Sequence, residues 1–277
     1  MSSHGTADAG GSASGAAPRP APGPPPLYVL GVTALTARCV AFVHTSGCAR
    51  LEAVLVPPAG AGAPPDADLV RAAADAGVPV REIDDLVEPV DAAAVAVGYP
   101  RILPARVLAL FGRGAMNLHL APLPWYRGAL TSLSFAVLRG EREFGVTLHV
   151  MDEGIDTGDV LARRDFPLPD DRTVADLLPL LLDEAYALFR SAFPDAVAGR
   201  TTPVPQSSWP GYERTRSVLY ARNALDGMQE LDGLDDLEAV DRAVRALSWR
   251  PGSEPFVRAP NGNRIALRLL PPDADAP

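Results

Sequence analysis

The hydrophobic and polar positions of the chain form short blocks that switch between two periodicities. Apolar, strand-like runs occupy residues 27–32, 51–56, 78–83, 91–97 and 145–151. Helical patterns occupy residues 33–44, 66–76, 103–111, 130–139 and 173–193, and Pro179 is expected to interrupt the last of them. This alternation with short connections predicts an α/β fold, Rossmann-like and doubly wound, in which helices cover both faces of a mostly parallel sheet.

The two ends of the chain differ in composition from its middle. Residues 1–26 consist largely of Gly, Ala, Ser and Pro, which bury too little apolar surface to become ordered, so we expect a disordered tail. Residues 27–200 hold the alternating elements and are predicted to form the main domain. Residues 271–277 are expected to fray.

A smaller unit is predicted after residue 200. The stretch 201–210 contains three prolines and is expected to be a linker. A helical pattern at 236–247 and two strand-like runs flanking Asn261–Gly262 predict a small C-terminal α+β subdomain over 211–270, with a hairpin that turns on the Asn-Gly pair. Exposed apolar residues of this hairpin would support a homodimer.

Composition and charge disfavour several classes of protein. No apolar run reaches the roughly 18 residues of a transmembrane helix, and the first residues lack the basic-then-apolar order of a signal peptide, so we expect a cytoplasmic protein without a membrane partner. The net charge is −9, and all 25 basic residues are arginine. An acidic chain without basic clusters disfavours a nucleic-acid partner, because that affinity comes largely from neutralised phosphates. Cys39 and Cys48 are expected to be reduced, packed thiols.

Nucleotide-binding motifs are missing at the expected places. The first strand-to-helix turn, Gly31–Ala34, lacks G-x-G-x-x-G, and G-x-x-x-x-G-K-[ST] does not occur. In open α/β sheets, ligands bind beyond the carboxyl ends of the strands. The loops at 98–103, 117–124 and 152–158 are expected to emerge there and to share one cleft.

Three polar residues near these loops predict an acyl-transfer site. Asn117 and His119 are two residues apart on an extended segment, so both side chains would face the same carbonyl group. The Asn amide can hold an oxygen that becomes negative, and a carboxylate from the loop 152–158 would favour the protonated form of the imidazole. In isolation these residues have simpler interpretations: Asn-x-His is common in loop caps, and the acidic loop is typical of turns or of a cation site that lacks EF-hand spacing.

The joint pattern is more specific than its parts. Asn117-x-His119, then Leu123-Pro124-x-x-Arg127-Gly128, Gly145-Val146-Thr147 and the run from Met151 to Gly158 resemble the formyltransferase family that uses 10-formyltetrahydrofolate. The resemblance covers roughly residues 27–200. It implies that Asn117 and His119 polarise the formyl oxygen, and that Asp156 orients or charges His119 and assists deprotonation of the acceptor amine.

The same resemblance assigns the co-substrate site and implies no metal. The folate would be held by two segments, with contacts at Gly98, Tyr99, Arg101, Ile102, Leu103, Val150, Met151, Asp152 and Glu153. These contacts would come largely from the backbone. His149, on the strand before the acidic loop, is interpreted as a support of the cleft wall.

The surroundings of the motifs narrow the acceptor. Methionyl-tRNA formyltransferases carry a basic insertion after the second strand, whereas residues 57–65 have no charged side chain. The C-terminal pattern resembles small-molecule members of the family, so we expect a nucleotide-linked amino sugar, with a hydroxyornithine or other natural-product precursor and methionyl-tRNA as alternatives. Five aromatic residues would be available to stack on a base, although core packing also explains each of them: Trp125, Tyr126, Trp209, Tyr212 and Trp249.

Two further alternatives concern the reaction itself. A formyltetrahydrofolate deformylase would use water in place of the amine, and a non-catalytic folate-binding protein would keep the site without turnover. The presence of all three polar groups favours the transferase.

Overall fold

The structure is a computed structural model that describes residues 23–210, 212, 218–221, 223–250 and 252–270 of the chain. The tails expected at 1–26 and 271–277 lie outside these residues, apart from 23–26. Pro26 already belongs to the first strand, and the Arg50 amide donates to the carbonyl oxygen of Pro25 at 2.8 Å.

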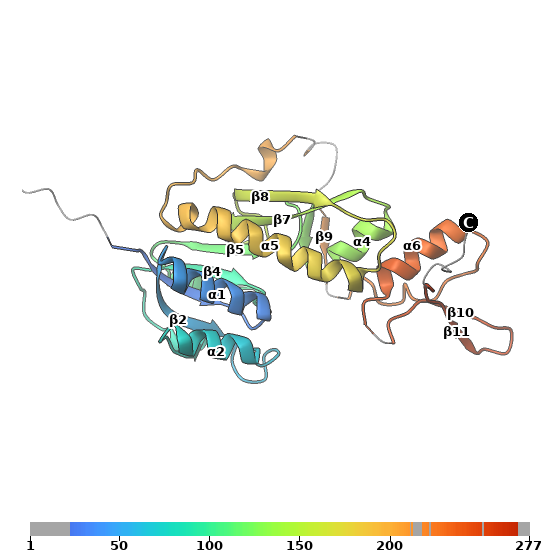
Figure 1. Cartoon of the computed structure of the whole chain (residues 1–277), viewed down its shortest axis with the longest axis horizontal. Helices are drawn as coiled ribbons and strands as arrows, with labels where there is room; N and C mark the ends of the chain where they lie inside the picture. Colours follow the sequence, from blue (N-terminus) through green and yellow to red (C-terminus); the bar gives the residue numbers. More distant parts are fainter. Residues whose placement is uncertain (1–22, 211, 213–217, 222, 251, 271–277) are drawn as a thin grey trace, which may run out of the picture.

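A seven-stranded sheet lies at the centre, with the strand order β3-β2-β1-β4-β5-β7-β8 (Figure 1). Its strands in chain order are β1 (Pro26–Leu30), β2 (Arg50–Val56), β3 (Val80–Glu82), β4 (Ala93–Val97), β5 (Ala115–His119), β7 (Glu143–Val150) and β8 (Val160–Pro167). The strands from β3 to β5 run parallel, whereas β7 is antiparallel to β5 and β8 to β7. The predicted mostly parallel α/β sheet is confirmed.

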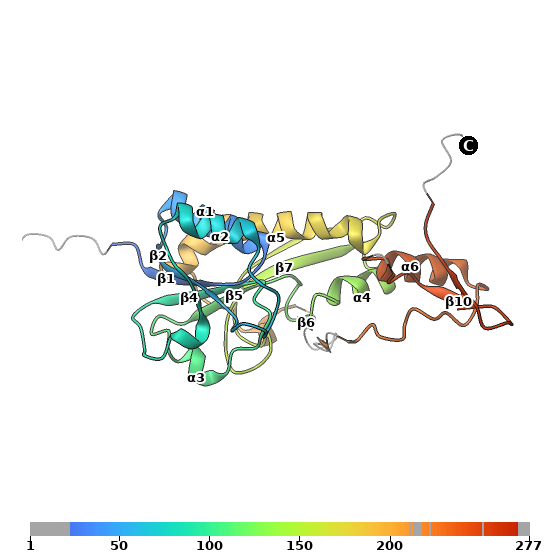
Figure 2. The ribbon, with the colours of Figure 1, turned by 90° about the horizontal axis from the view of Figure 1, so that it is seen from below.

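Helices cover the two faces of the sheet unequally. One face carries α1 (Ala34–Ser46), α2 (Ala67–Asp75) and α5 (Val174–Val197), and the short α3 (Ala105–Leu108) lies on the other side (Figure 2). The buried apolar side chains of α1, α2 and α5 share one large cluster. Leu103 and Phe111, which flank α3, belong to a smaller cluster together with strand residues that face the other side of the sheet. Alternation along each strand therefore separates two cores.

The smaller elements extend the molecule away from β1–β3 (Figure 1). They are β6 (Tyr126–Gly128), α4 (Ser132–Leu138), β9 (Val218–Tyr220), α6 (Leu237–Leu247), β10 (Phe256–Arg258) and β11 (Arg264–Ala266). α6 packs against α4, and β10 and β11 form the predicted hairpin, with Gly262 at a φ of 85° in its turn. None of the described helices is long and apolar enough to cross a membrane.

The first turn of the fold closes without a nucleotide-binding motif. Thr33 caps α1 in a capping box with Thr36, whose hydroxyl also donates to the carbonyl oxygen of Val97 at 2.7 Å. A Cβ at Gly31 would lie 2.2 Å from that same oxygen. Glycine is needed here because the turn packs directly against the end of β4.

The helix predicted at 103–111 is shorter in the structure than expected. Only Ala105–Leu108 is helical, because Phe111 turns into the smaller apolar cluster and forms a parallel bridge with Val90. Burial of this aromatic ring outweighs the gain from a further helical turn.

The interruption predicted at Pro179 is also wrong. α5 is continuous and contains both Pro179 and Pro194. A proline within the first two turns removes only one backbone donor, and the buried stripe that includes Leu177 and Leu181 continues across it.

Three strands were not predicted. β6 and β9 have only three residues each and pair with one another in parallel. β8 carries the charged residues Arg163, Arg164 and Asp165 at its centre, which hide its apolar periodicity, and it lies at the edge of the sheet, where charged side chains are tolerated.

The pairing of β5 with β7 determines which face carries the polar groups. Leu118 packs into the large cluster under α1 and α5, so Asn117 and His119 point to the opposite face. Across the strands, His149 is the register partner of Asn117, and Thr147 is the partner of His119. Four polar side chains thus share one face of this strand pair.

Candidate active site

The acidic loop between β7 and β8 presents one carboxylate to the sheet. Asp152 is used inside the loop, where Oδ1 accepts from the hydroxyl of Thr157 at 2.6 Å and from the amide of Gly154 at 3.1 Å. A Cβ at Gly158 would lie 1.9 Å from the carbonyl oxygen of Val150, so the loop folds back tightly on the end of β7. This tight return leaves the side chain of Asp156 facing β5.

The structure brings the three predicted catalytic residues together. Oδ1 of Asp156 accepts from Nδ2 of Asn117 at 3.4 Å, and Oδ2 lies 3.7 Å from Nδ1 of His119. The backbone N–H of Gly128 donates to Oδ2 at 2.8 Å. Asp156 adopts a left-handed φ of 53°, the only positive φ of a described non-glycine residue, and the contacts from three segments hold it there.

His149 lies at the site itself. Its Nε2 is 3.2 Å from Nδ2 of Asn117 and 3.6 Å from Oδ1 of Asp156. Its Nδ1 lies 2.7 Å from the carbonyl oxygen of Val150, which can only accept, so Nδ1 carries a proton and donates. In the neutral ring Nε2 is therefore an acceptor for Asn117, a closer role than support of the cleft wall.

The protonation states of His119 and Asp156 follow from burial and from their neighbours. Burial lowers the pKa of His119, and this effect outweighs the raising effect of the Asp156 charge. Burial raises the pKa of Asp156, but the adjacent His149 side chain, the charge of His119 and the Gly128 amide outweigh it and bring the value to about 2. Asp156 does favour the protonated form of His119, as expected, but the cost of desolvation is larger and sets the net direction of the pKa shift.

The arrangement is suited to proton transfer next to a carbonyl group. Nε2 of His119 donates to the carbonyl oxygen of Tyr126 at 2.8 Å, so in the neutral ring the unprotonated nitrogen is Nδ1, on the side of Asp156. An imidazole that gains a proton would be stabilised by the adjacent carboxylate. The site can therefore accept a proton and stabilise the resulting charge.

The two predicted folate segments meet on the face that carries Asn117. Tyr99, Leu103 and Met151 all pack at the smaller apolar cluster. Gly98 has a φ of 61°, and a Cβ there would lie 2.8 Å from the side chain of Thr33. The hydroxyl of Tyr99 is buried without a partner, which fits a place for a polar ligand.

The remaining predicted folate residues are placed differently. Arg101, Ile102 and Glu153 are exposed at the surface of the two loops. Val150 lies at the other edge of the strand pair, where its backbone N–H donates to the carbonyl oxygen of Asp159. Their contacts with a folate stay predictions.

Residues 67–193 match the model of the formyl transferase family. This match and the relatives below support the assignment of the chain to this family. The match covers all three predicted catalytic positions and ends within α5.

Relatives of known sequence and structure agree with this family. The methionyl-tRNA formyltransferase of Sorangium cellulosum is 40% identical over 159 residues, which are 54% of this chain and 51% of that protein. The chain thus spans about half the length of this curated relative.

Two solved structures share the fold. One is an N-formyltransferase from Helicobacter canadensis, in complex with folinic acid and dTDP-3-aminofucose, with a TM-score of 0.65, 20% identity and 79% of each chain covered. The other is a sugar N-formyltransferase from a Shewanella species, with a TM-score of 0.70, 16% identity and coverage of 88% of this chain and 96% of that one.

Gln206 contacts the loop that carries Asp156, a role that the sequence pattern did not predict. It lies in the proline-rich stretch 201–210, and its buried side-chain amide donates to the carbonyl oxygens of Asp156 at 2.9 Å and of Gly158 at 2.8 Å. Val204 in the same stretch bonds to Val160 of β8 through both backbone groups. The predicted linker therefore supports the acidic loop. A polar residue between prolines was the only signal for it.

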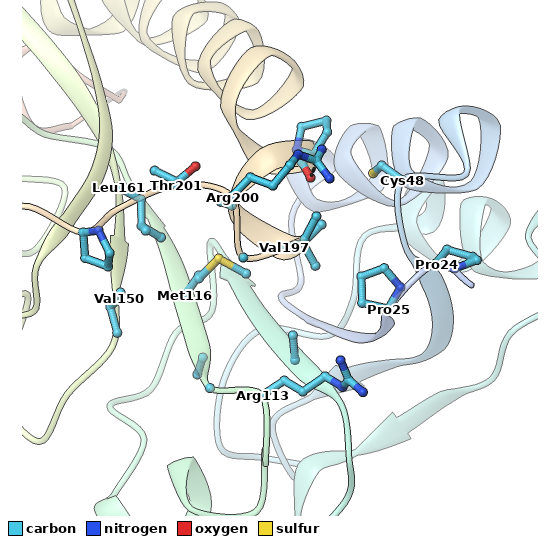
Figure 3. Close-up of a pocket in the computed structure, with 18 of the residues that line it drawn as sticks. Pro24, Pro25, Cys48, Arg113, Met116, Val150, Leu161, Val197, Arg200 and Thr201 are labelled. Atoms are coloured by element: carbon cyan, nitrogen blue, oxygen red, sulfur yellow. Dashed lines mark hydrogen bonds between the residues drawn. The ribbon is translucent and has the colours of Figure 1, made fainter. Parts of the chain in front are cut away.

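An open cavity of about 780 Å³ lies at the other end of the parallel strands. Its wall includes the starts of β4 and β5 and the end of α5, with Met116, Val197 and Arg200 lining it (Figure 3). Arg113 and Arg200, its two arginines, are paired with Asp91 and Asp195. Since both charges are matched, the cavity offers less chemistry than the Asp156 site.

The two cysteines are free thiols, as predicted. Cys39 is fully buried in the large cluster, and burial raises the pKa of its thiol, so it is unreactive. Cys48 is partly buried. In the part of the chain that the structure describes, no group of three or more His, Cys, Asp or Glu residues could hold a metal ion.

Proposed function

We propose that this protein is an N-formyltransferase that moves the formyl group of 10-formyltetrahydrofolate to the amine of a small molecule. The observation that carries the proposal is the contact of Asp156 with Asn117, His119 and His149 on one face of the β5–β7 pair. Its carboxylate is ionised next to a neutral imidazole. This arrangement supplies a neutral amide donor for a carbonyl oxygen and a base for an amine.

The reaction can be written with these groups. The acceptor nitrogen attacks the formyl carbon, and the carbonyl oxygen, which becomes negative, is held by the Asn117 amide, which gives up its long 3.4 Å hydrogen bond to Asp156 for this oxygen. The proton that leaves the attacking nitrogen goes to His119, whose imidazolium is stabilised by Asp156. The bond from carbon to N10 of the folate then breaks, and that nitrogen takes the proton from His119, giving tetrahydrofolate and a formamide.

We further propose a nucleotide-linked amino sugar as the acceptor. The fold is shared with a structure that holds dTDP-3-aminofucose. The C-terminal part favours a small acceptor over tRNA, because residues 211–270 contain nine acidic and nine basic side chains and so carry no excess of positive charge. Three of these arginines are paired with carboxylates of the same region: Arg242 with Glu238, Arg245 with Asp241 and Arg258 with Glu230. The region therefore offers no net positive charge to a phosphate backbone.

Methionyl-tRNA is the second candidate acceptor. It is favoured by the function of the curated relative, with which this chain shares 40% identity over 159 residues. The C-terminal region, which has no excess of basic residues, argues against it, and a direct comparison of acceptors decides.

The test is the release of tetrahydrofolate from 10-formyltetrahydrofolate with a panel of acceptors. The panel contains dTDP-linked amino sugars, N5-hydroxyornithine, charged initiator tRNA and a blank without amine. We expect turnover to require an amine and to be fastest with an amino sugar nucleotide. Highest activity with N5-hydroxyornithine or tRNA would overturn the proposed acceptor. Turnover in the blank would indicate a deformylase, and folate binding without any turnover a non-catalytic protein.

A further inference from the structure

Strand β6 forms a wall between the catalytic residues and β9. On one edge, the carbonyl group of Tyr126 accepts from His119 and the amide of Gly128 donates to Asp156. The other edge pairs with β9, where Arg127 is the register partner of Leu219. Arg127 therefore lies between the two peptide groups that hold the catalytic residues.

The side chain of Arg127 leaves this wall on the face opposite to Tyr126. The Tyr126 ring is buried in the core, with its centroid 5.5 Å from those of Phe144 and Tyr220. Since side chains alternate along a strand, Arg127 projects to the other side.

Arg127 carries a charge that nothing in the described chain neutralises. Its Nε is buried without a hydrogen-bond partner, and no carboxylate of a described residue lies within 4.0 Å of its guanidinium nitrogens. Arg163, by contrast, donates to Asp165 at 2.7 Å and to the carbonyl oxygen of Leu123 at 3.0 Å. A partly buried guanidinium without an anion is costly, which points to a partner that arrives with a ligand.

Two indole rings near β6 also have a buried N–H group without a hydrogen-bond partner. Nε1 of Trp125 and Nε1 of Trp209 are both buried without an acceptor. Their rings lie 4.2 Å and 5.3 Å from the Arg163 guanidinium, so these two aromatic residues are held by Arg163 and not free to stack on a base. The wall next to the catalytic residues thus offers donors without acceptors.

We propose that Arg127 binds an anionic group of the formyl acceptor, a phosphate or a carboxylate, and so selects acceptors that carry such a group near the amine. The planar guanidinium binds either anion through two parallel hydrogen bonds. Arg127 is a specificity residue in this account. The proposal rests on the proposed N-formyltransferase function.

The experiment compares acceptors that differ only in the anion. One pair is a dTDP-linked amino sugar and the free amino sugar, and the other is N5-hydroxyornithine and its methyl ester. Within the pair that the wild-type protein formylates, we expect kcat/KM to be about 10- to 100-fold higher for the anionic member than for its neutral counterpart. In Arg127→Gln this ratio should fall to near one, with the KM for 10-formyltetrahydrofolate unchanged. Arg127→Lys should give an intermediate ratio.

Arg142→Gln is the matched control, because Arg142 is an exposed surface arginine paired with Asp170. It should keep the wild-type ratio. An unchanged ratio in Arg127→Gln, or a rise of the KM for the folate alone, would overturn the assignment. The second outcome would place the anion on the folate.

Direct binding separates this proposal from the proposed function. Calorimetry with dTDP and with N5-hydroxyornithine needs no turnover. We expect one of the two to bind to the wild-type protein and to bind at least about tenfold more weakly to Arg127→Gln. If neither binds to the wild-type protein, the assignment of Arg127 is wrong; if one binds while no amine is formylated, the proposed function fails instead.

Discussion

The backbone N–H of Gly128 donates a 2.8 Å hydrogen bond to Oδ2 of Asp156. Gly128 has a φ of 96°, and a Cβ there would lie 2.3 Å from the carbonyl oxygen of Tyr220 on β9. The absence of a side chain lets β6 approach β9 and the catalytic carboxylate at the same time. The position of Asp156 therefore depends on a strand pair that the sequence pattern does not reveal.

Gly128→Ala tests this dependence. The methyl group must push β9 away or shift the Gly128 amide, and the positive φ adds strain, so we expect a loss of about 1–3 kcal/mol in the free energy of unfolding. Turnover should fall at least about tenfold. Gly233→Ala is the control, because the nearest atom to its Cβ is a flexible carboxylate oxygen 3.6 Å away, and it should leave both denaturant unfolding and turnover unchanged.

Asp156→Asn removes the charge that stabilises a protonated His119 while keeping the shape of the side chain. We expect kcat to fall by about 100- to 10,000-fold, with the dissociation constant of the folate nearly unchanged. Single-turnover kinetics and fluorescence titration measure the two quantities. Asp170→Asn on the surface should behave as wild type. Equal losses of binding and turnover would contradict the catalytic role.

The pH dependence of turnover should report His119. Because burial lowers its pKa below the ordinary 6.5, the imidazole is neutral at pH 7 and can accept a proton. The value of kcat/KM should fall as the pH drops through a midpoint below 6.5, while Asp156, with a pKa of about 2, stays ionised throughout. A midpoint above 6.5 would show that His119 acts from its protonated form.

The lowered pKa of His119 also makes the free energy of unfolding depend on pH. The folded-state pKa of His119 lies below its unfolded value, so the unfolded chain binds more protons between the two. The contribution of His119 to the free energy of unfolding should therefore decrease as the pH falls from 6.5 towards the folded-state pKa. Denaturant unfolding of His119→Asn should lack this decrease. An equal decrease in the variant would assign it to another group.

Gln206→Met tests the support of the acidic loop from the stretch 201–210. The change keeps the volume of the side chain and removes both donors to the loop carbonyls, which should cost about 1–3 kcal/mol of unfolding free energy. The less ordered loop should also lower kcat by about tenfold. Gln229→Met, at a partly exposed site, is the matched control. A loss of stability with an unchanged kcat would reduce Gln206 to a purely structural residue.

Most strands, and the shared face of Asn117 and His119, were predictable from the sequence because their signals are local. Runs such as 51–56 and 91–97 are apolar over the length of a buried strand, and the structure has strands at Arg50–Val56 and Ala93–Val97. Asn117 and His119 share a face because they are two residues apart on a strand. Asp156 followed from the family pattern and could not be placed by spacing alone.

The remaining features depend on distant contacts that leave little trace in the sequence. Gln206 is 50 positions from Asp156, and β9 is 92 positions from β6 at the pair Tyr126 and Val218. The protonation state of His119 depends on the balance between burial and a nearby charge, and the sequence reveals only the charge. The sequence therefore indicates the effect of Asp156 on the pKa of His119 but not the net direction of the shift.

The most direct test of the account is the fate of a ¹³C-labelled formyl group in a single turnover. Wild-type protein is mixed with labelled 10-formyltetrahydrofolate and the best acceptor of the panel, and the products are followed by NMR. We predict that the label appears in a formamide of the acceptor, and that Asp156→Asn forms this product far more slowly while still binding the folate. Label released only as formate, or a formamide formed equally fast by Asp156→Asn, would contradict it.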